Sequence, residues 1–237
     1  MVTMGFWSCN RYRLVVFILV ALILFQLFRL MPRKPSTHID DTGLVELEDD
    51  KYNKHKKDRV KIRVYYEALC PDSKHFFIKH LKPVTEDLAE FLEVTLIPYG
   101  KATTKEANGK YYFTCQHGEE ECLANKIHAC SIEALGNMTE YVSFTTCMIS
   151  DNMDAVQALK RCASEMKVDL EPIRKCATNK HGSALLKKYG DDTHAVKPTF
   201  IPTILVNGSK DNQAALLKKF LLEVCKLINI PLPPPCL

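Results

Sequence analysis

A cysteine between a predicted strand and a predicted helix is the feature that most constrains the fold of this chain. Residues 60–66 (VKIRVYY) alternate β-branched and aromatic residues with basic ones, which is typical of a strand. Cys70 follows, and Pro71 suits the first turn of a helix because its missing N–H group would have no partner there. A thiol in that place lies near free N–H groups and the positive end of a helix dipole. The sequence therefore predicts a reactive cysteine on a strand–turn–helix unit.

The residue three places after Cys70 is a serine. A thioredoxin-type redox centre has a second cysteine there, whereas this chain has Ser73. The second thiol of such a centre resolves the mixed disulfide with a substrate, and a serine hydroxyl has no redox capacity. The chain supplies a group that attacks a disulfide but lacks the usual resolving group beside it.

The segments after Cys70 continue a pattern of strands and helices. A helix is expected to run to about residue 81, with Pro83 interrupting or kinking it. Residues 93–97 (EVTLI) are expected to form a second strand. Residues from about 101 to 195 contain helical spacings and are predicted to be mostly helix and loop.

The C-terminal part returns to a strand and a helix. Residues 200–208 include Ile201-Pro202 and end in Asn-Gly, which predicts a strand followed by a tight hairpin turn. Residues 213–228 are expected to form one last amphipathic helix. The order of elements predicts a thioredoxin-like α/β fold with a large, disulfide-bonded helical insertion at about residues 101–195.

Residues 14–31 are predicted to be a signal anchor, a transmembrane helix. Leu14 to Phe25 is an uninterrupted apolar run, and as a helix the whole segment would reach about 27 Å, close to the roughly 30 Å of a bilayer core. The alternative is a cleaved signal peptide, whose apolar region is about 7–15 residues long and whose removal would give a secreted protein. The flank 29–34 offers no Ala-x-Ala-like cleavage site, which favours the anchor.

The remaining N-terminal residues are predicted to flank this anchor. Residues 1–13 would be a short tail. Residues 32–58 are polar and charged, and because they cannot bury enough apolar surface to fold, we expect a flexible stem. The globular domain is expected at residues 59–237.

Cysteines are numerous, with ten in the chain and nine of them after the apolar segment. An odd number leaves at least one thiol free or paired with another molecule. If Cys70 is the free one, four bridges of open connectivity are expected among the other eight: Cys115, Cys122, Cys130, Cys147, Cys162, Cys176, Cys225 and Cys236. On one continuous helix, Cys122 and Cys130 would lie about 12 Å apart, too far to bond to each other.

Two glycosylation sequons agree with an oxidising compartment. They begin at Asn137 (Asn-Met-Thr) and Asn207 (Asn-Gly-Ser). Together with the cysteine content, they predict that most of the chain lies in a lumenal or extracellular space.

Charge and residue spacing argue against two other classes. The net charge is only +4 and no aromatic-interleaved basic stripe is present, so nucleic acid is a poor candidate partner. The cysteines and histidines of residues 115–130 match no standard zinc spacing, and disulfides are favoured over zinc in this compartment. Neither a metal nor a bound cofactor is expected.

Residues 115–130 read CQHGEEECLANKIHAC. This segment resembles the signature of the gamma-interferon-inducible lysosomal thiol reductase family, C-Q-H-G-x-x-E-C-x-x-N-x-x-x-x-C, with every fixed position filled. The resemblance extends from about residue 60 to residue 228. It implies a thioredoxin-like, lumenal enzyme of lysosomes or related compartments that reduces disulfides of protein substrates.

The resemblance also implies roles for individual residues. Cys70 corresponds to the attacking cysteine, and Ser73 stands where the family has the resolving one. Ile201 and Pro202 correspond to the segment whose cis proline faces that cysteine and presents backbone to an extended substrate. An external thiol such as glutathione or free cysteine would then be the reductant. Because Ser73 puts turnover in question, the alternative is a catalytically degenerate binding module that captures partner proteins.

Overall fold

The computed structural model describes residues 59–229 and 231–237. The predicted tail, anchor and stem at residues 1–13, 14–31 and 32–58 lie outside the described residues. None of the helices within the described ranges is long and apolar enough to cross a membrane.

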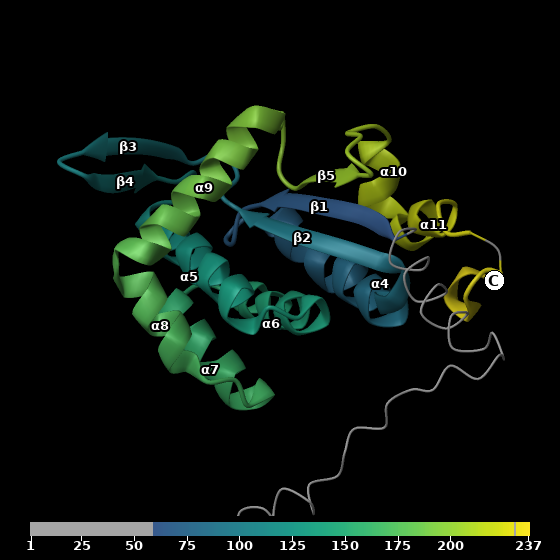
Figure 1. Ribbon diagram of the computed structural model, residues 1–237, viewed down its shortest axis with the longest axis horizontal. Helices are drawn as coiled ribbons and strands as arrows, with labels where there is room; N and C mark the ends of the chain where they lie inside the picture. Colours follow the sequence, from purple (N-terminus) through teal and green to yellow (C-terminus); the bar gives the residue numbers. More distant parts are fainter. Residues whose placement is uncertain (1–58, 230) are drawn as a thin grey trace, which may run out of the picture. The chain divides into compact units, whose positions relative to one another are not determined.

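A three-stranded sheet in the order β2-β1-β5 lies at the centre of the described chain (Figure 1). Its strands are β1 (Val60–Tyr66), β2 (Leu92–Pro98) and β5 (Thr203–Val206). β1 runs parallel to β2 and antiparallel to β5. The β-branched and aromatic residues of β1 are buried on both faces at its C-terminal end, as expected of a central strand.

The connection from β1 to β2 is helical from Pro71 to Phe91, apart from Leu88. It comprises α3 (Pro71–Phe76), a π-helical turn η1 (Phe77–Leu81), α4 (Lys82–Asp87) and a short 3-10 turn η2 (Ala89–Phe91). The predicted interruption at Pro83 takes the form of the wide turn η1, which lies directly before the proline-containing first turn of α4.

The insertion begins with a hairpin that the sequence analysis missed. Its strands are β3 (Thr103–Ala107) and β4 (Lys110–Thr114), which pair antiparallel. Asn108 and Gly109 join them with φ values of 52° and 66°. Two positive φ values are what a tight two-residue turn requires, and Asn-Gly supplies them at low cost. The expectation of mostly helix and loop for residues 101–195 therefore missed the two strands at residues 103–114.

Five helices follow the hairpin and make up the rest of the insertion. They are α5 (Glu119–Leu135), α6 (Met138–Ser150), α7 (Ala155–Met166), α8 (Leu170–Thr178) and α9 (Lys180–Val196). Of these, α5, α6 and α9 contact β2, so the insertion packs against that edge of the sheet (Figure 1).

The C-terminal part differs from its predicted form in two places. After β5, Asn207 and Gly208 turn the chain, but only one bridge forms, between Val206 and Ser209. No return strand forms there because the Gln213 side chain bonds both the N–H and the carbonyl of Ile204.

The predicted last helix is also divided in two. It consists of α10 (Gln213–Lys218) and α11 (Phe220–Cys225), separated by Lys219 with non-helical angles. Leu227, which falls within the predicted helix, lies beyond the end of α11 and is 46% exposed. A short turn η3 (Pro234–Cys236) ends the chain.

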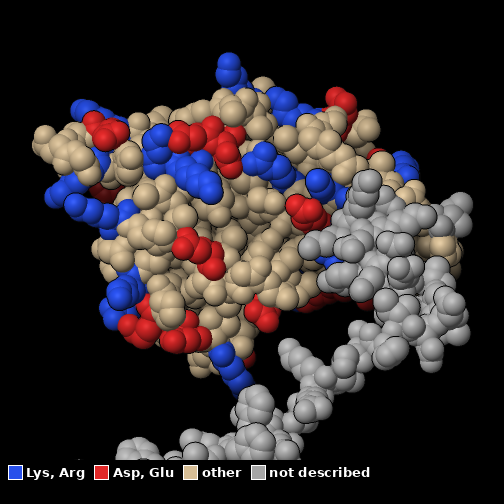
Figure 2. All heavy atoms as spheres, viewed as in Figure 1, with Lys and Arg blue, Asp and Glu red and all other residues tan. Residues whose placement is uncertain are grey.

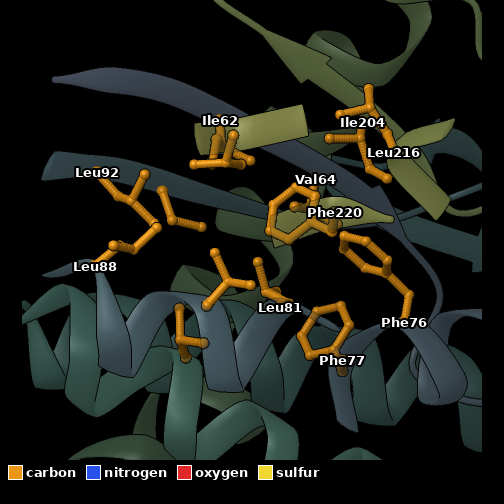
Figure 3. Close-up of a cluster of buried hydrophobic side chains, with 14 of the residues drawn as sticks. Ile62, Val64, Phe76, Phe77, Leu81, Leu88, Leu92, Ile204, Leu216 and Phe220 are labelled. Atoms are coloured by element: carbon orange, nitrogen blue, oxygen red, sulfur yellow. The ribbon is translucent and has the colours of Figure 1, made fainter. Parts of the chain in front are cut away.

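The main core lies between the sheet, the helical segment α3–η1–α4, helix α6 of the insertion, and the helices α10 and α11 (Figure 3). Its buried members are large, among them Phe76, Phe77, Leu81, Leu92 and Phe220. On the face shown in Figure 2, acidic and basic side chains are interspersed over the surface.

Four disulfides connect eight of the cysteines. The pairs are Cys115–Cys122, Cys130–Cys176, Cys147–Cys162 and Cys225–Cys236. The first three cross-link the insertion, and the fourth holds the C-terminal tail to α11. Cys122 and Cys130 share helix α5 and bond to different partners, in agreement with their separation along the helix.

Candidate active site

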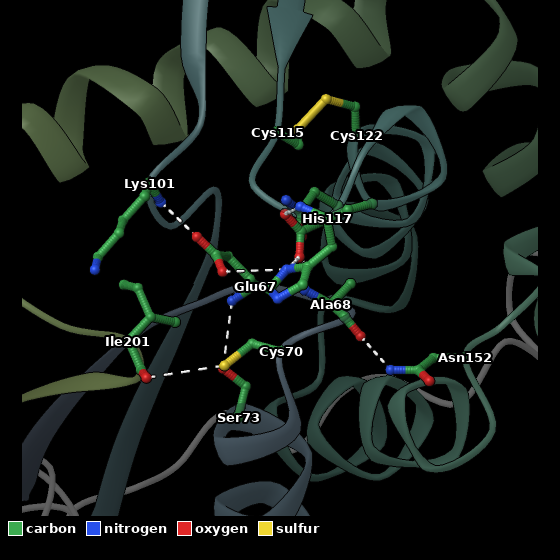
Figure 4. A network of polar contacts seen from close by, with 12 residues as sticks. Glu67, Ala68, Cys70, Ser73, Lys101, Cys115, His117, Cys122, Asn152 and Ile201 are labelled. Atoms are coloured by element: carbon green, nitrogen blue, oxygen red, sulfur yellow. Dashed lines mark hydrogen bonds and ion pairs between the residues drawn. A yellow bond between two sulfur atoms is a disulfide. The ribbon is translucent and has the colours of Figure 1, made fainter.

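Cys70 occupies the N-cap position of α3, in the turn that follows β1 (Figure 4). It is the one cysteine of the described residues outside a disulfide, and it is 8% exposed. Its Sγ lies 3.8 Å from the carbonyl oxygen of Ile201. The peptide bond between Ile201 and Pro202 is cis. The fold thus brings together residues that are 131 positions apart in the chain.

Ser73 lies on the inner side of the same turn. It is fully buried, and its Oγ accepts a hydrogen bond of 3.4 Å from the backbone N–H of Glu67. The hydroxyl therefore bonds the backbone of the segment before Cys70. Sequence reasoning placed Ser73 beside Cys70 and did not anticipate this backbone contact.

Both backbone polar groups of Ala68 are bound by asparagine side chains from the insertion. The Asn125 Oδ1 of α5 accepts from the Ala68 N–H at 2.9 Å. Asn152, in the connection between α6 and α7, donates from Nδ2 to the Ala68 carbonyl at 2.6 Å. Two separate parts of the insertion thus hold a residue two positions before Cys70.

Glu67 places a carboxylate in the interior beside this turn. Its side chain is 1% exposed, and its Oε1 accepts from the Lys101 N–H at 2.6 Å. Its Oε2 lies 3.6 Å from Nδ1 of His117, which in turn lies 2.5 Å from Oε2 of Glu121. Burial is the main cause that raises the pKa of Glu67, with the nearby Glu121 adding to it and the Lys101 hydrogen bond and His117 opposing it.

Gly100 makes room for the Glu67 side chain. It has a φ of +63°, and a Cβ atom there would lie 2.0 Å from Glu67 Cγ. Any other residue would displace the carboxylate from the Lys101 N–H.

Glu67, His117 and Glu121 are also residue types that bind metals, and their ligand atoms lie within 4.8 Å of one another. In the structure His117 bonds Glu121 and lies at ion-pair distance from Glu67, which accepts from the Lys101 N–H, so these polar atoms already have protein partners. Sequence reasoning missed Glu67, although an acidic residue at the end of an otherwise apolar strand is a usable signal.

His128 is another buried polar residue of α5. It is 1% exposed, and its Nδ1 lies 3.0 Å from the hydroxyl of Tyr66 on β1. Burial lowers the pKa of His128 to about 3. The imidazole is therefore neutral, and it joins the insertion to the sheet.

The two sequons lie on the surface. Asn137 caps the N-terminus of α6, where its side chain accepts from the N–H groups of Thr139 and Glu140. The Oδ1 of Asn207 accepts from the Lys61 N–H at 2.9 Å. Both residues are exposed, and their glycosylation stays a prediction.

Comparison with known proteins bears on this geometry. The family model of gamma interferon inducible lysosomal thiol reductase (GILT) matches residues 61–166. A gamma-interferon-inducible lysosomal thiol reductase-like protein of Anopheles gambiae is 35% identical over 195 residues, which cover 76% of this chain and 80% of the relative. The chain belongs to the GILT family. The resemblance inferred from residues 115–130 is confirmed.

Other relatives agree with this assignment. A gamma-interferon-inducible lysosomal thiol reductase of Carassius auratus is 34% identical over 183 residues, covering 75% of this chain and 72% of the relative. GILT-like protein 1 of Drosophila melanogaster is 35% identical over 196 residues, covering 75% and 78%. The GILT match includes the Cys70 turn and the signature.

The fold extends beyond proteins of similar sequence. The oxidised form of BdbD from Bacillus subtilis superposes with a TM-score of 0.52 at 14% identity, covering 71% of this GILT-family chain and 86% of that chain. The predicted thioredoxin-like α/β fold with a disulfide-bonded helical insertion is confirmed.

Proposed function

We propose that this GILT-family chain is a lumenal thiol–disulfide oxidoreductase that attacks protein disulfides through Cys70. The observation that carries the proposal is the placement of the free Cys70 thiol at the start of α3, against the cis Ile201–Pro202 bond. Membership of the GILT family supports it, as do the names of the relatives, a thiol reductase of Carassius auratus and a thiol reductase-like protein of Anopheles gambiae.

The exchange at Cys70 balances with two equivalents of an external thiol. The Cys70 thiolate attacks one sulfur of the substrate disulfide, forms a mixed disulfide and releases the other sulfur as a thiolate. A first external thiol attacks the Cys70 sulfur, which frees the second substrate thiol and leaves a mixed disulfide with the external thiol. A second external thiol restores Cys70. The substrate disulfide is reduced to two thiols, and two external thiols, such as two glutathiones or two free cysteines, are oxidised to one disulfide.

Ile201 and Pro202 are proposed to bind the substrate backbone. Both are buried, and the Ile201 carbonyl faces Cys70. Ser73 is proposed to keep the turn in place through its hydrogen bond to Glu67 rather than to take part in exchange.

One observation favours a second candidate, a module that captures partner proteins. Ser73 is fully buried and bonded to backbone, and the other eight cysteines of the described residues are in disulfides. No thiol among the described residues therefore resolves a mixed disulfide at Cys70. Where external thiols are scarce, the mixed disulfide would persist and the partner would stay bound.

We place this activity in the lumen of the endolysosomal system. The names of the relatives support this, as do four disulfides, which persist in oxidising compartments. We further propose that residues 14–31 attach the protein to the membrane. The alternative is secretion after cleavage of a signal peptide.

Turnover with the full-length protein tests the proposal. We expect glutathione-supported reduction of a protein disulfide, such as that of insulin, between pH 4.5 and 7.5. Cys70→Ala should abolish it, whereas Cys147→Ala/Cys162→Ala, which removes a disulfide within the insertion, should retain it. Equal rates for wild type and Cys70→Ala would overturn the proposal.

A further inference from the structure

We infer that three residues of the signature are positioning residues for Cys70: His117, Glu121 and Asn125. Apart from Gln116, they are the fixed positions of the signature that carry a charged, imidazole or amide side chain. This inference rests on the proposed function, because it assigns these residues to exchange at that thiol. Each of the three acts through Glu67 or Ala68, and none of the three forms a hydrogen bond to the sulfur.

Asn125 makes the most direct connection. It is fully buried, and its Oδ1 holds the Ala68 N–H at 2.9 Å, while Asn152 holds the carbonyl of the same residue. With both backbone groups bound to the insertion, Ala68 cannot rotate without breaking two hydrogen bonds in a buried place. Each such loss is costly because the freed groups have no water to replace the partner.

His117 and Glu121 act one residue earlier, on Glu67. Glu121 accepts from the His117 N–H at 3.1 Å and from its ring at 2.5 Å, which fixes the imidazole against the Glu67 carboxylate. Glu67 is held on its other oxygen by the Lys101 N–H. The side chain of Glu67 thus joins β1, the loop after β2 and the signature (Figure 4).

These contacts reach Cys70 through a short piece of backbone. The Glu67 carbonyl accepts from the Cys70 N–H at 3.4 Å, and the Glu67 N–H donates to Ser73. Glu67 and Ala68 are therefore the fixed base from which the turn presents the sulfur toward Ile201. Disulfide exchange needs the three sulfurs in line, so its rate depends on this direction more than alkylation by a small reagent does.

The Cys115–Cys122 disulfide also helps to hold His117 and Glu121 in place. It closes the loop that carries His117 and Glu121, with a sequence separation of 7 residues. The segment thus acts as one unit, in which the disulfide holds the loop and the loop holds the turn of Cys70.

The test compares four single variants of the full-length protein. Asn125→Leu removes the acceptor at similar size, Asn125→Asp keeps it, and His117→Ala removes the imidazole beside Glu67 at a position whose side chain is 33% exposed. Ser131→Ala is the matched control, because Ser131 is a buried α5 residue whose hydroxyl bonds only its own helix, at the Ile127 carbonyl.

Three quantities are measured for each variant: hydrogen exchange of the peptide that contains residues 67–70, exchange of Cys70 with oxidised glutathione, and alkylation of Cys70 by iodoacetamide. For Asn125→Leu and His117→Ala we expect about tenfold faster hydrogen exchange and about tenfold slower disulfide exchange, with alkylation unchanged or faster. Asn125→Asp should restore the hydrogen-exchange protection, and Ser131→Ala should match wild type throughout.

The outcomes separate this inference from the proposed function. If residues 67–70 are as well protected from hydrogen exchange in Asn125→Leu and His117→Ala as they are in Ser131→Ala, the inference is wrong, whatever the activity of the enzyme. If wild-type Cys70 does not react with oxidised glutathione, the proposed function fails, and the hydrogen-exchange result still decides whether the signature holds the turn. If Asn125→Leu does not fold, His117→Ala gives the same decision.

Discussion

The sheet half and the insertion of this protein are stabilised by different means. The core beside the sheet contains large side chains, among them Phe76, Phe77 and Phe220, and none of its buried members is alanine. The core of the insertion contains six alanines among its buried members: Ala68, Ala124, Ala155, Ala158, Ala163 and Ala177. Two disulfides, Cys130–Cys176 and Cys147–Cys162, also cross-link this core. Small side chains bury little apolar area each, so covalent links offset the weaker packing.

The active-site turn lies at the boundary between these two regions. Ala68 belongs to the insertion core although it lies only two residues after the end of the sheet strand β1. We therefore infer that the insertion supports the reactive turn, while the core beside the sheet supplies most of the stability of the fold. Four predictions test this division, beginning with the largest expected effect.

Truncation in the sheet core should cost the most stability. Phe77→Ala is expected to lower the free energy of unfolding by about 3–5 kcal/mol, because Phe77 is fully buried among large side chains. Urea unfolding measures this. Leu222→Ala, at a position that is 51% exposed, is the control and should stay within about 0.5 kcal/mol of wild type. A loss at Phe77 as small as that of the control would show that the sheet core is not the main source of stability.

Removal of an insertion disulfide should come next and act locally. Cys130→Ala/Cys176→Ala opens a link across 46 residues and is expected to cost roughly 2–4 kcal/mol. Hydrogen exchange should accelerate in α5 and α8, which the disulfide joins, and not in β1 or β2. Uniform acceleration over both regions would contradict the division. Cys225→Ala/Cys236→Ala is the control, since it frees only the C-terminal tail.

Acidification should weaken the contact between the two regions at His128. The pKa of His128 is about 3 in the folded state and 6.5 in the unfolded state. The unfolded state therefore binds a proton first, and the free energy of unfolding that His128 contributes above pH 6.5 is lost as the pH falls below 6.5. Between pH 7 and pH 5 this amounts to about 2 kcal/mol. His128→Gln, which keeps a polar partner for Tyr66, should remove this part of the pH dependence. Exposed His181→Gln should leave it unchanged, and an identical pH profile for His128→Gln and wild type would count against the assignment.

Glu67 should have the smallest effect on the pH dependence of stability, and its sign should be opposite to that of His128. Its folded-state pKa is raised, so its contribution is fully present below the ordinary value of 4.5 and is lost as pH rises through the raised value. Unfolding of wild type and Glu67→Gln, compared from pH 4 to pH 7.5, should show wild type losing stability relative to the variant with rising pH. A relative gain with rising pH would indicate that the carboxylate is stabilised in its charged form.

Local sequence signals predicted the part of the fold that lies around Cys70. The alternation of residues 60–66, the proline after Cys70 and the apolar run 93–97 each specify their element from neighbouring residues alone. The family signature at residues 115–130 indicated the overall fold. These are patterns in which local propensity and tertiary structure agree.

The parts that were missed depend on distant contacts or on a rival pattern. The break at Lys219 divides a segment whose spacing is helical throughout, and the two helices have different neighbours: α10 contacts β5, whereas α11 contacts η1 and η3. The hairpin at residues 103–114 had its Asn108-Gly109 signal, which the surrounding polar residues obscured. The contacts of Glu67 with Lys101 and His117 join residues 34 and 50 positions away, and no periodicity in the sequence reports such pairs.

The central claim is that Cys70 exchanges disulfides without a resolving thiol of its own. Intact mass spectrometry of the full-length protein, mixed with a disulfide peptide and then with glutathione, tests it most directly. We expect a mixed disulfide at Cys70 that persists until glutathione is added and then decays at a rate proportional to the glutathione concentration. In Ser73→Cys the adduct should disappear without glutathione. Release of the peptide from the wild-type protein at the same rate with and without glutathione would contradict the account.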